Sequence, residues 1–384
     1  RSHFVEHPMT YARSRLWLGI TAIGTLIFIA FLLLSTGFHL EVLHDSPNTN
    51  INEFGRLAAI VLTTGILLVP FDLLGGFILP RRFGRESIRF TRFALAWSRG
   101  VAVQSVCLIA SLWSVLQAGQ LFGLAGSLTA VLTIQFLMLL GQKMLAIFSG
   151  SLSFDLAESV PSEFHGRPVS AASHRDSGFT GSIVGLPGAE NIVMPASWST
   201  NLTREQLNAE IVRRWGAIRT GSRTRGIFLA VLINTGTFGM SAMMPNAGVT
   251  TVAELLSTTL YFTLGSFIWL LVLPRLSREG VFESDRFAFD SGIPVREIES
   301  AANRIEALHD NEPGRSRQLE SVFHPVPCVR RRVAELSLRL RSIHGFWNVA
   351  RTTLFLSWAC GGFLARAVHC NIGRPELWVL FPTD

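Results

Sequence analysis

Charged residues are scarce in this sequence. They make up 16% of the 384 residues, whereas a soluble domain carries about 25%. All but one of the 34 basic residues are arginine, the exception being Lys143. The shortage of charge falls in long apolar runs, which excludes an ordinary soluble domain and indicates an integral membrane protein.

Common catalytic and metal-binding motifs are also missing. The four cysteines form no C-x-x-C pair, so neither a zinc ribbon nor a disulfide framework is indicated. No G-x-S-x-G, P-loop or G-x-G-x-x-G motif occurs. His3 and His7 fit the inverted zinc motif H-x-x-E-H, but Pro8 follows directly and disfavours the helix which that motif needs. We interpret this stretch as a solvated tail.

Apolar runs long enough to cross a membrane occur along the chain. A spanning helix needs about 20 apolar residues. Six runs qualify, at 16–38, 57–79, 101–117 with its flanks, 121–141, 226–244 and 255–273. A seventh and weaker run, 346–365, contains Arg351. The predicted fold class is therefore mainly α, a polytopic helical membrane protein with six or seven spans.

The arginines predict the orientation. Segment 81–100 holds six arginines and one glutamate, whereas the loop 39–56 holds three acids and one arginine. An arginine excess marks cytoplasmic loops, so the N-terminus and the polar segments 150–225 and 275–345 are expected in the cytoplasm, with the protein in a bacterial inner (cytoplasmic) membrane. This distribution accounts for the net charge of +7. Membrane lipids are the expected partners, and nucleic acid is not.

One carboxylate, Asp72, lies inside a predicted span. An ionisable residue at membrane depth suggests a function, and a transport role stays open. Neutralisation by an arginine, or capping of backbone freed by Pro70, is an equally good interpretation.

The polar segments contain recognisable local signals. Two β-like runs, 179–186 and 190–195, are joined by turn residues at 187–189 and predict a hairpin. Thr203 followed by Gln206 predicts the capped start of a helix, and apolar residues recur along that helix at helical spacing.

The order of these features is similar to that of a known family. A hairpin with an "LPG" turn, a strand "IVMP", a capped helix and a transmembrane hairpin precede the segment "SREGVFESDRFA" and an "HP" step before a basic helix. This order resembles the HtpX-like membrane zinc metallopeptidases, whose eukaryotic relatives include the CAAX prenyl protease. The resemblance covers roughly residues 179–340 and implies a cytoplasmic metalloprotease-like α+β domain formed by the two polar segments.

The apolar runs and the resemblance together predict a division of the chain. Residues 1–150 would form a four-span membrane domain. Residues 151–345 would form the metallopeptidase-like domain, with an inserted transmembrane hairpin at 226–274. Residues 346–384 would form a C-terminal span and tail.

The family's catalytic residues are missing at the matching positions. The family carries H-E-x-x-H on this helix, with two histidine ligands and a glutamate that activates water. Arg213 and Ala217 stand at the ligand positions, Arg214 stands at the base, and Val281 stands at the third ligand. Because a guanidinium offers a metal no lone pair, we expect no metal, no cofactor and no protease activity.

Three residues match supporting positions or could pair with the arginines. Asp285 and His324 match supporting positions of the family, and Glu283 and Asp285 are candidate ion-pair partners for Arg213 and Arg214. Such a pair would replace zinc as a clasp between the two polar segments.

The leading functional hypothesis is a catalytically inactive subunit, structural or accessory, of a larger membrane protein complex, with other membrane subunits as partners. One alternative is a pseudoprotease that binds extended polypeptide by strand addition and regulates membrane-protein turnover. Its binding edge would be the strand made of Glu190, Asn191, Ile192, Val193 and Met194. The remaining alternative is an active zinc metalloprotease.

Overall fold

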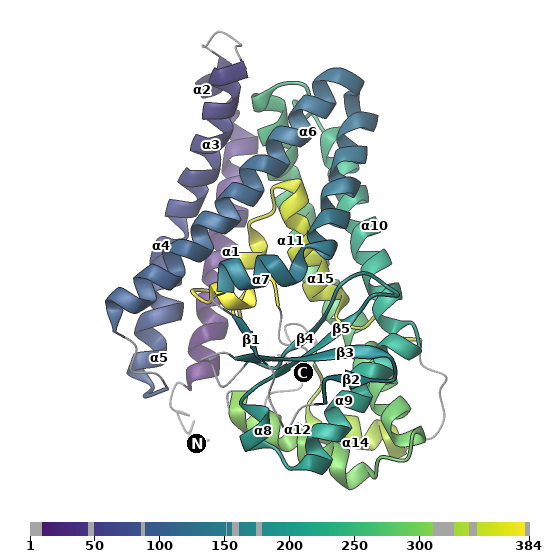
Figure 1. The fold of residues 1–384 in the computed structure, drawn as a ribbon. Coiled ribbons are helices and arrows are strands. Elements are labelled where there is room, and N and C mark those ends of the chain that lie inside the picture. Colours follow the sequence, from purple (N-terminus) through teal and green to yellow (C-terminus); the bar gives the residue numbers. More distant parts are fainter. Residues whose placement is uncertain are drawn as a thin grey trace, which may run out of the picture.

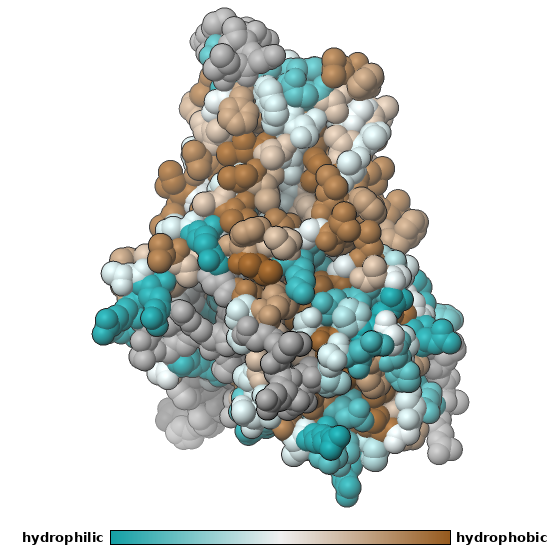
Figure 2. All heavy atoms as spheres, viewed as in Figure 1, coloured by the Kyte–Doolittle hydropathy of each residue, from teal (hydrophilic) through white to brown (hydrophobic). Residues whose placement is uncertain are grey.

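The computed structural model describes residues 10–44, 50–85, 89–150, 152–155, 161–173, 179–309, 326–337 and 344–380. In these residues a cone of long helices stands on a smaller part that contains a sheet and shorter helices (Figure 1). Apolar residues cover much of the cone, and polar residues gather on the sheet-bearing part (Figure 2). Exposed Phe28, Phe136 and Phe228 belong to the apolar surface. This distribution is that of a membrane protein whose helices face lipid.

The long helices are α1 (Tyr11–Thr36), α3 (Asn50–Leu67), α6 (Phe90–Leu140), α10 (Ser222–Ala242) and α11 (Val252–Asp290). Within the described ranges, α1, α6 and α11 are long and apolar enough to cross a membrane. A fourth candidate is α3 with its continuation through α4 (Val69–Leu73), the π-helical turn η1 (Leu74–Ile78) and α5 (Leu79–Arg82), bent by 42°. The expected number of six or seven spans is thus not confirmed.

Helix α6 contains two of the expected spans as a helical hairpin. The reversal lies at Gly123, with φ 62° and ψ −153°. This backbone conformation is essentially restricted to glycine. The two arms meet where Ser127 Oγ donates to the carbonyl oxygen of Val115 at 2.9 Å, and Figure 1 shows the reversal at the top of the cone.

The expected seventh span at 346–365 is wrong. The segment forms α15 (Val349–Leu356), a 3-10 turn η2 (Ser357–Cys360) and α16 (Leu364–Ala367), followed by η3 (Pro375–Leu377). These pieces lie inside the cone of long helices (Figure 1), and every side chain from Leu354 to Cys360 is buried. Interrupted backbone is tolerated at membrane depth only where protein surrounds it. The segment is apolar because it packs against protein rather than lipid.

Asp72 holds this inner segment in place. Its carboxylate accepts hydrogen bonds from Arg366 Nε at 2.7 Å, from the amide of Gly373 at 2.9 Å and from Trp97 Nε1 at 3.0 Å. Asp72 and Arg366 are each 1% exposed, so each charge depends on the other for solvation. The expected neutralisation by an arginine is confirmed.

The sheet lies beneath the cone. Its strands are β1 (Ser153–Asp155), β2 (Glu163–Phe164), β3 (Arg167–Ser173), β4 (Ser182–Val184) and β5 (Asn191–Pro195). The order is β1-β3-β5-β4, with β2 added on β3. The predicted hairpin is confirmed, because β4 and β5 pair antiparallel with Ile183 opposite Ile192.

Short helices surround the sheet. They are α2 (Phe38–His44) in the first loop, α7 (Gln142–Gly150) beneath the cone, and α8 (Trp198–Asn201), α9 (Arg204–Arg219), α12 (Val295–His309) and α14 (Val329–Ser337) below the sheet. The predicted capping box at the start of α9 is confirmed. Thr203 Oγ1 accepts from the amide of Gln206, and Gln206 Oε1 accepts from the amide of Thr203.

Replacing Asp72 should destabilise the protein strongly. In the Asp72→Asn variant Arg366 keeps its buried charge without a counter-charge, which costs on the order of 3–5 kcal/mol. Thermal unfolding in detergent measures the change. Asp290→Asn is the matched control, because Asp290 pairs with Arg286 at the surface, where its side chain is 60% exposed and the loss is under about 1 kcal/mol. Equal stability of the two variants would contradict the role given to Asp72.

Candidate functional site

The positions that the resemblance assigns to the zinc site lie on two facing helices. Arg213, Arg214 and Ala217 belong to α9, and Val281 belongs to the C-terminal half of α11. All four side chains are buried, with exposed fractions between 0% and 3%. Helix α11 continues from the cone into the sheet-bearing part despite Pro274 in its interior. This continuity brings Val281 and Asp285 opposite α9.

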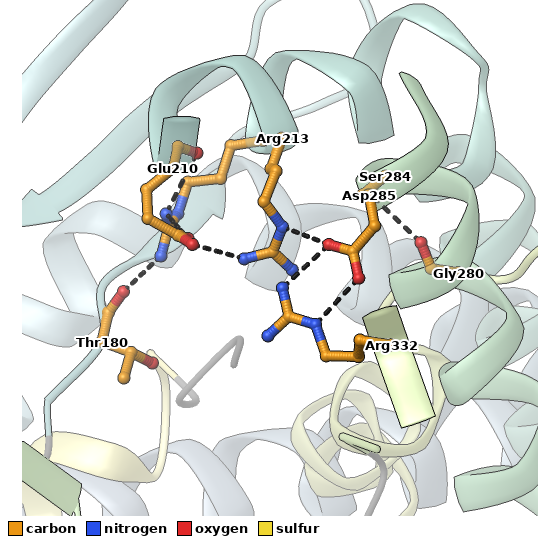
Figure 3. A network of polar contacts seen from close by, with 8 residues as sticks. Thr180, Glu210, Arg213, Gly280, Ser284, Asp285 and Arg332 are labelled. Atoms are coloured by element: carbon orange, nitrogen blue, oxygen red, sulfur yellow. Dashed lines mark hydrogen bonds and ion pairs between the residues drawn. The ribbon is translucent and has the colours of Figure 1, made fainter. Parts of the chain in front are cut away.

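Arg213 forms an ion pair with Asp285 of α11. Its Nε donates to Asp285 Oδ1 at 2.5 Å. Arg332 of α14 donates to the same carboxylate, with Nε to Oδ2 and Nη2 to Oδ1, each at 2.8 Å. Figure 3 shows the carboxylate between the two guanidinium groups. Asp285 therefore joins α9, α11 and α14 at one point.

Glu210, one turn before the arginines on α9, completes the network. Its carboxylate accepts from Arg213 Nη1 at 2.6 Å and from Arg214 Nη1 at 3.1 Å. Arg214 Nη2 donates to the carbonyl oxygen of Thr180 at 2.6 Å, and its guanidinium lies 5.0 Å from the ring centre of Trp198. Arg214 thus contacts the backbone that leads into β4 as well as its own helix.

The network consists of guanidinium and carboxylate groups. Arg213, Arg214 and Arg332 contribute the guanidinium groups, and Glu210 and Asp285 contribute carboxylates that accept their hydrogen bonds. A guanidinium donates hydrogen bonds and offers a metal ion no lone pair. Among the described ranges, no three His, Cys, Asp or Glu residues lie close enough together to hold a metal ion.

The other two matching positions are part of the apolar core. Ala217 packs in a cluster with Ile183 of β4 and Trp347, and Val281 is 3% exposed. Neither side chain can bind a metal ion or transfer a proton. Chemically, the arrangement can pair charges and fill space.

Glu283 does not pair with Arg213 or Arg214. It binds Arg225 of α10, with Nη2 at 2.8 Å from Oε2, and accepts from the amide of Gly345 at 2.7 Å. Two residues along a helix rotate a side chain by about 200°, so Glu283 and Asp285 leave α11 in different directions. Of the two expected partners, only Asp285 contacts Arg213. His324, together with His3 and His7, lies outside the described residues.

The expected polypeptide-binding edge is wrong. The strand that contains Asn191, Ile192, Val193 and Met194 is β5, which lies between β3 and β4. Both of its sides are hydrogen-bonded to neighbouring strands, so no further strand can add there. Glu190, just before β5, is buried and pairs with Arg167 at 3.3 Å.

The overall arrangement is similar to that of a solved membrane protein. This chain has a Ste24p-like fold. The structure of Ste24p from S. mikatae superposes with a TM-score of 0.67 over 85% of this chain and 86% of that chain, at 14% sequence identity. No family model and no curated protein matches the sequence.

At this identity the likeness concerns the fold. The expected membrane protein with a CAAX protease-like fold is confirmed.

Sequence reasoning missed several residues of the Ste24p-like core. Glu210 carried a readable signal, because it stands three and four residues before Arg213 and Arg214, where helical neighbours meet. Arg332 gave no such signal, since it is one of three consecutive arginines. Trp347 lies beyond the part of the chain that resembled the family.

Removing either α9 arginine should loosen the sheet-bearing part. Arg213→Ala leaves Asp285 with one partner, and Arg214→Ala removes the link to Thr180, so a loss on the order of 3–5 kcal/mol is expected for the buried pair. Limited proteolysis between residues 275 and 345 should become faster. Arg219→Ala is the matched control, because Arg219 ends the same helix and is exposed. Cleavage at the wild-type rate in both variants would show that the network does not hold these segments together.

Proposed function

We propose that this chain is a catalytically inactive, metallopeptidase-like membrane protein that serves as a structural or accessory subunit of a larger membrane complex. The observation that carries the proposal is the Asp285 carboxylate, which is bound by Arg213 and Arg332. Arg213 matches a zinc ligand of the family, so an ion pair stands where the family has a metal bond. A buried, paired guanidinium is a joint between helices rather than a reactive group.

The chemistry of the substituted positions supports this proposal. Zinc-dependent hydrolysis needs three protein ligands, and a fourth position for water whose pKa the metal lowers. Arg214 stands at the position of the general base, and guanidinium keeps its protons in proteins. Ste24p is a CAAX prenyl protease of the membrane zinc metallopeptidase kind, and we propose that this chain keeps that fold without its reaction.

The two alternative functions have less support. A pseudoprotease that binds polypeptide on the 190–194 strand would need a free edge there, and β5 has none. An active zinc protease would need ligands other than the residues at the matching positions. The subunit hypothesis requires surfaces for other membrane proteins, and the exposed apolar helices provide area for lipid and protein alike.

The orientation and location belong to the same proposal. The arginine excess of segment 81–100 supports a cytoplasmic sheet-bearing part under the positive-inside rule. We propose a bacterial inner membrane as the location, with lipids and other membrane subunits as the partners.

Zinc should not co-purify with the protein. The expected content, measured by elemental analysis of detergent-purified protein, is far below one zinc per chain, because the matching positions offer no ligand. The variant without residues 1–8 controls for metal held by His3 and His7. About one zinc per chain in both proteins would refute the proposed inactivity.

A stoichiometric partner should accompany the protein in mild detergent. Expression at the native level avoids an excess of unassembled chain, and mass spectrometry of the purified material gives the composition. One or a few membrane proteins in fixed ratio are expected of a subunit. A mixture of unrelated client fragments would support the pseudoprotease alternative instead.

A further inference from the structure

The space between the free edge of strand β4 and helix α9, called the groove below, is filled by side chains of the protein itself. Strand β4 is the last strand of the sheet, and in the described residues it pairs only with β5. Its other side faces the region where α9, α10 and the segment 344–348 meet. A free strand edge of this kind accepts extended polypeptide by strand addition, with backbone hydrogen bonds giving affinity and side-chain pockets giving specificity. In this protein other groups occupy both the hydrogen-bonding side and the apolar side.

An arginine side chain donates hydrogen bonds to carbonyl oxygens at this edge. Arg223, at the start of α10, donates from Nη2 to the oxygens of Ile183 at 3.4 Å and Gly185 at 2.5 Å. One guanidinium therefore binds an oxygen of β4 and an oxygen just after the strand. Arg214 binds the oxygen of Thr180, which precedes β4. A polypeptide added to this edge would need the oxygen of Ile183 as an acceptor.

The apolar side of the groove is filled by Trp347. Its side chain is 5% exposed and packs with Ile183 of β4 and Ala217 of α9. Ala217 is one of the positions that match a zinc ligand. The indole therefore lies between the strand edge and the helix that carries the altered site, where a side chain of a bound polypeptide would otherwise insert.

The segment around Trp347 is fixed along its length. The amide of Trp347 donates to Ser222 Oγ at 3.0 Å, and the amide of Gly345 donates to Glu283 Oε2 at 2.7 Å. A Cβ atom at Gly280 would lie 2.5 Å from the Trp347 Cα. The backbone of the segment thus rests directly on α11.

One nitrogen of the Arg223 guanidinium lacks a hydrogen-bond partner. Arg223 Nη1 has no hydrogen-bond partner in the described structure, although it lies 3.9 Å from Glu190 Oε1. Burial lowers the pKa of Arg223 to about 10, and the Glu190 carboxylate opposes that fall. The guanidinium is still charged at neutral pH, and it lines a cavity of about 20 Å³ beside Ser182 and Trp347, with room for about one water molecule.

We propose that Arg223 and Trp347 together close a polypeptide groove from within, so that the resting protein excludes extended polypeptide. Arg223 satisfies the strand's carbonyl groups, and Trp347 fills the adjoining apolar space. The inference deepens the proposed function, because a groove that is permanently occupied suits a subunit and not a client-binding regulator.

Peptide binding by the full-length protein tests the closure. The probe is a fluorescent peptide with the sequence of residues 342–349, and fluorescence anisotropy in detergent measures its affinity. The double variant R223M/W347A should bind it at least about tenfold more tightly than the wild type, an equilibrium difference of about 1.4 kcal/mol. The control R219M/W17A makes the same two chemical changes at exposed residues and should bind like the wild type. A folded double variant without added affinity would overturn the proposal.

Hydrogen exchange of the wild type tests the closure of the groove even if the double variant does not fold. The amides of Gly345 and Trp347 should be protected to the same degree as those of α10 and α11. Exchange as fast as in exposed loops would show that the groove stands open, and would also overturn the proposal. Zinc content is measured on the same sample. Bound zinc with a protected segment would overturn the proposed inactivity alone, whereas an exposed segment without zinc would overturn the closure alone.

Discussion

The Asp285 carboxylate is the point on which the sheet-bearing part depends. It lies at the end of a helix that begins in the membrane, and it binds one arginine from α9 and another from α14. Helices α9, α11 and α14, which are far apart in the sequence, are therefore joined through the two oxygen atoms of the Asp285 carboxylate. A charge with 0% exposure has no water to solvate it, so its partners must stay in place for the protein to remain folded. This constraint fixes the distance between the two polar segments of the chain.

The same device recurs where the inner segment meets the cone. Asp72 binds Arg366, and Arg15 of α1 donates to the carbonyl oxygens of His369 and Ile372. Arginine suits these places because its planar group donates several hydrogen bonds at once and stays charged when buried. Arg15 binds backbone oxygens in a segment of short, interrupted helices, and Arg366 binds a side-chain carboxylate. The chain thus uses ion pairs and guanidinium–carbonyl bonds where a longer helix would satisfy its own backbone.

Much of the local structure could be predicted from the sequence, and the errors have physical causes. The β4–β5 hairpin and the capped start of α9 depend on residues a few positions apart, so short-range signals sufficed. The pairing of Arg213 with Asp285 was expected from a resemblance that aligned the two segments. The strand at 190–194 is not at an edge, because β3 pairs with it in parallel. β3 lies about twenty residues earlier, and no short-range sequence signal predicts a pairing over that distance. The run 346–365 was read as a span because apolar composition is the same for a lipid-facing helix and for a segment surrounded by protein.

By itself the sequence determined that the chain is a membrane protein with long apolar helices, and its resemblance to a zinc metallopeptidase family implied arginine, alanine and valine at the ligand positions. These properties follow from the composition and from the order of residues along the chain, so they can be read without knowing the fold. Only the tertiary structure decided which acid faces which arginine. Glu283 and Asp285 are two residues apart, yet one binds Arg225 and the other binds Arg213, because a helix turns them to different neighbours. The tertiary structure also decided that Trp347 lies against β4, since that contact joins residues that are far apart in the sequence.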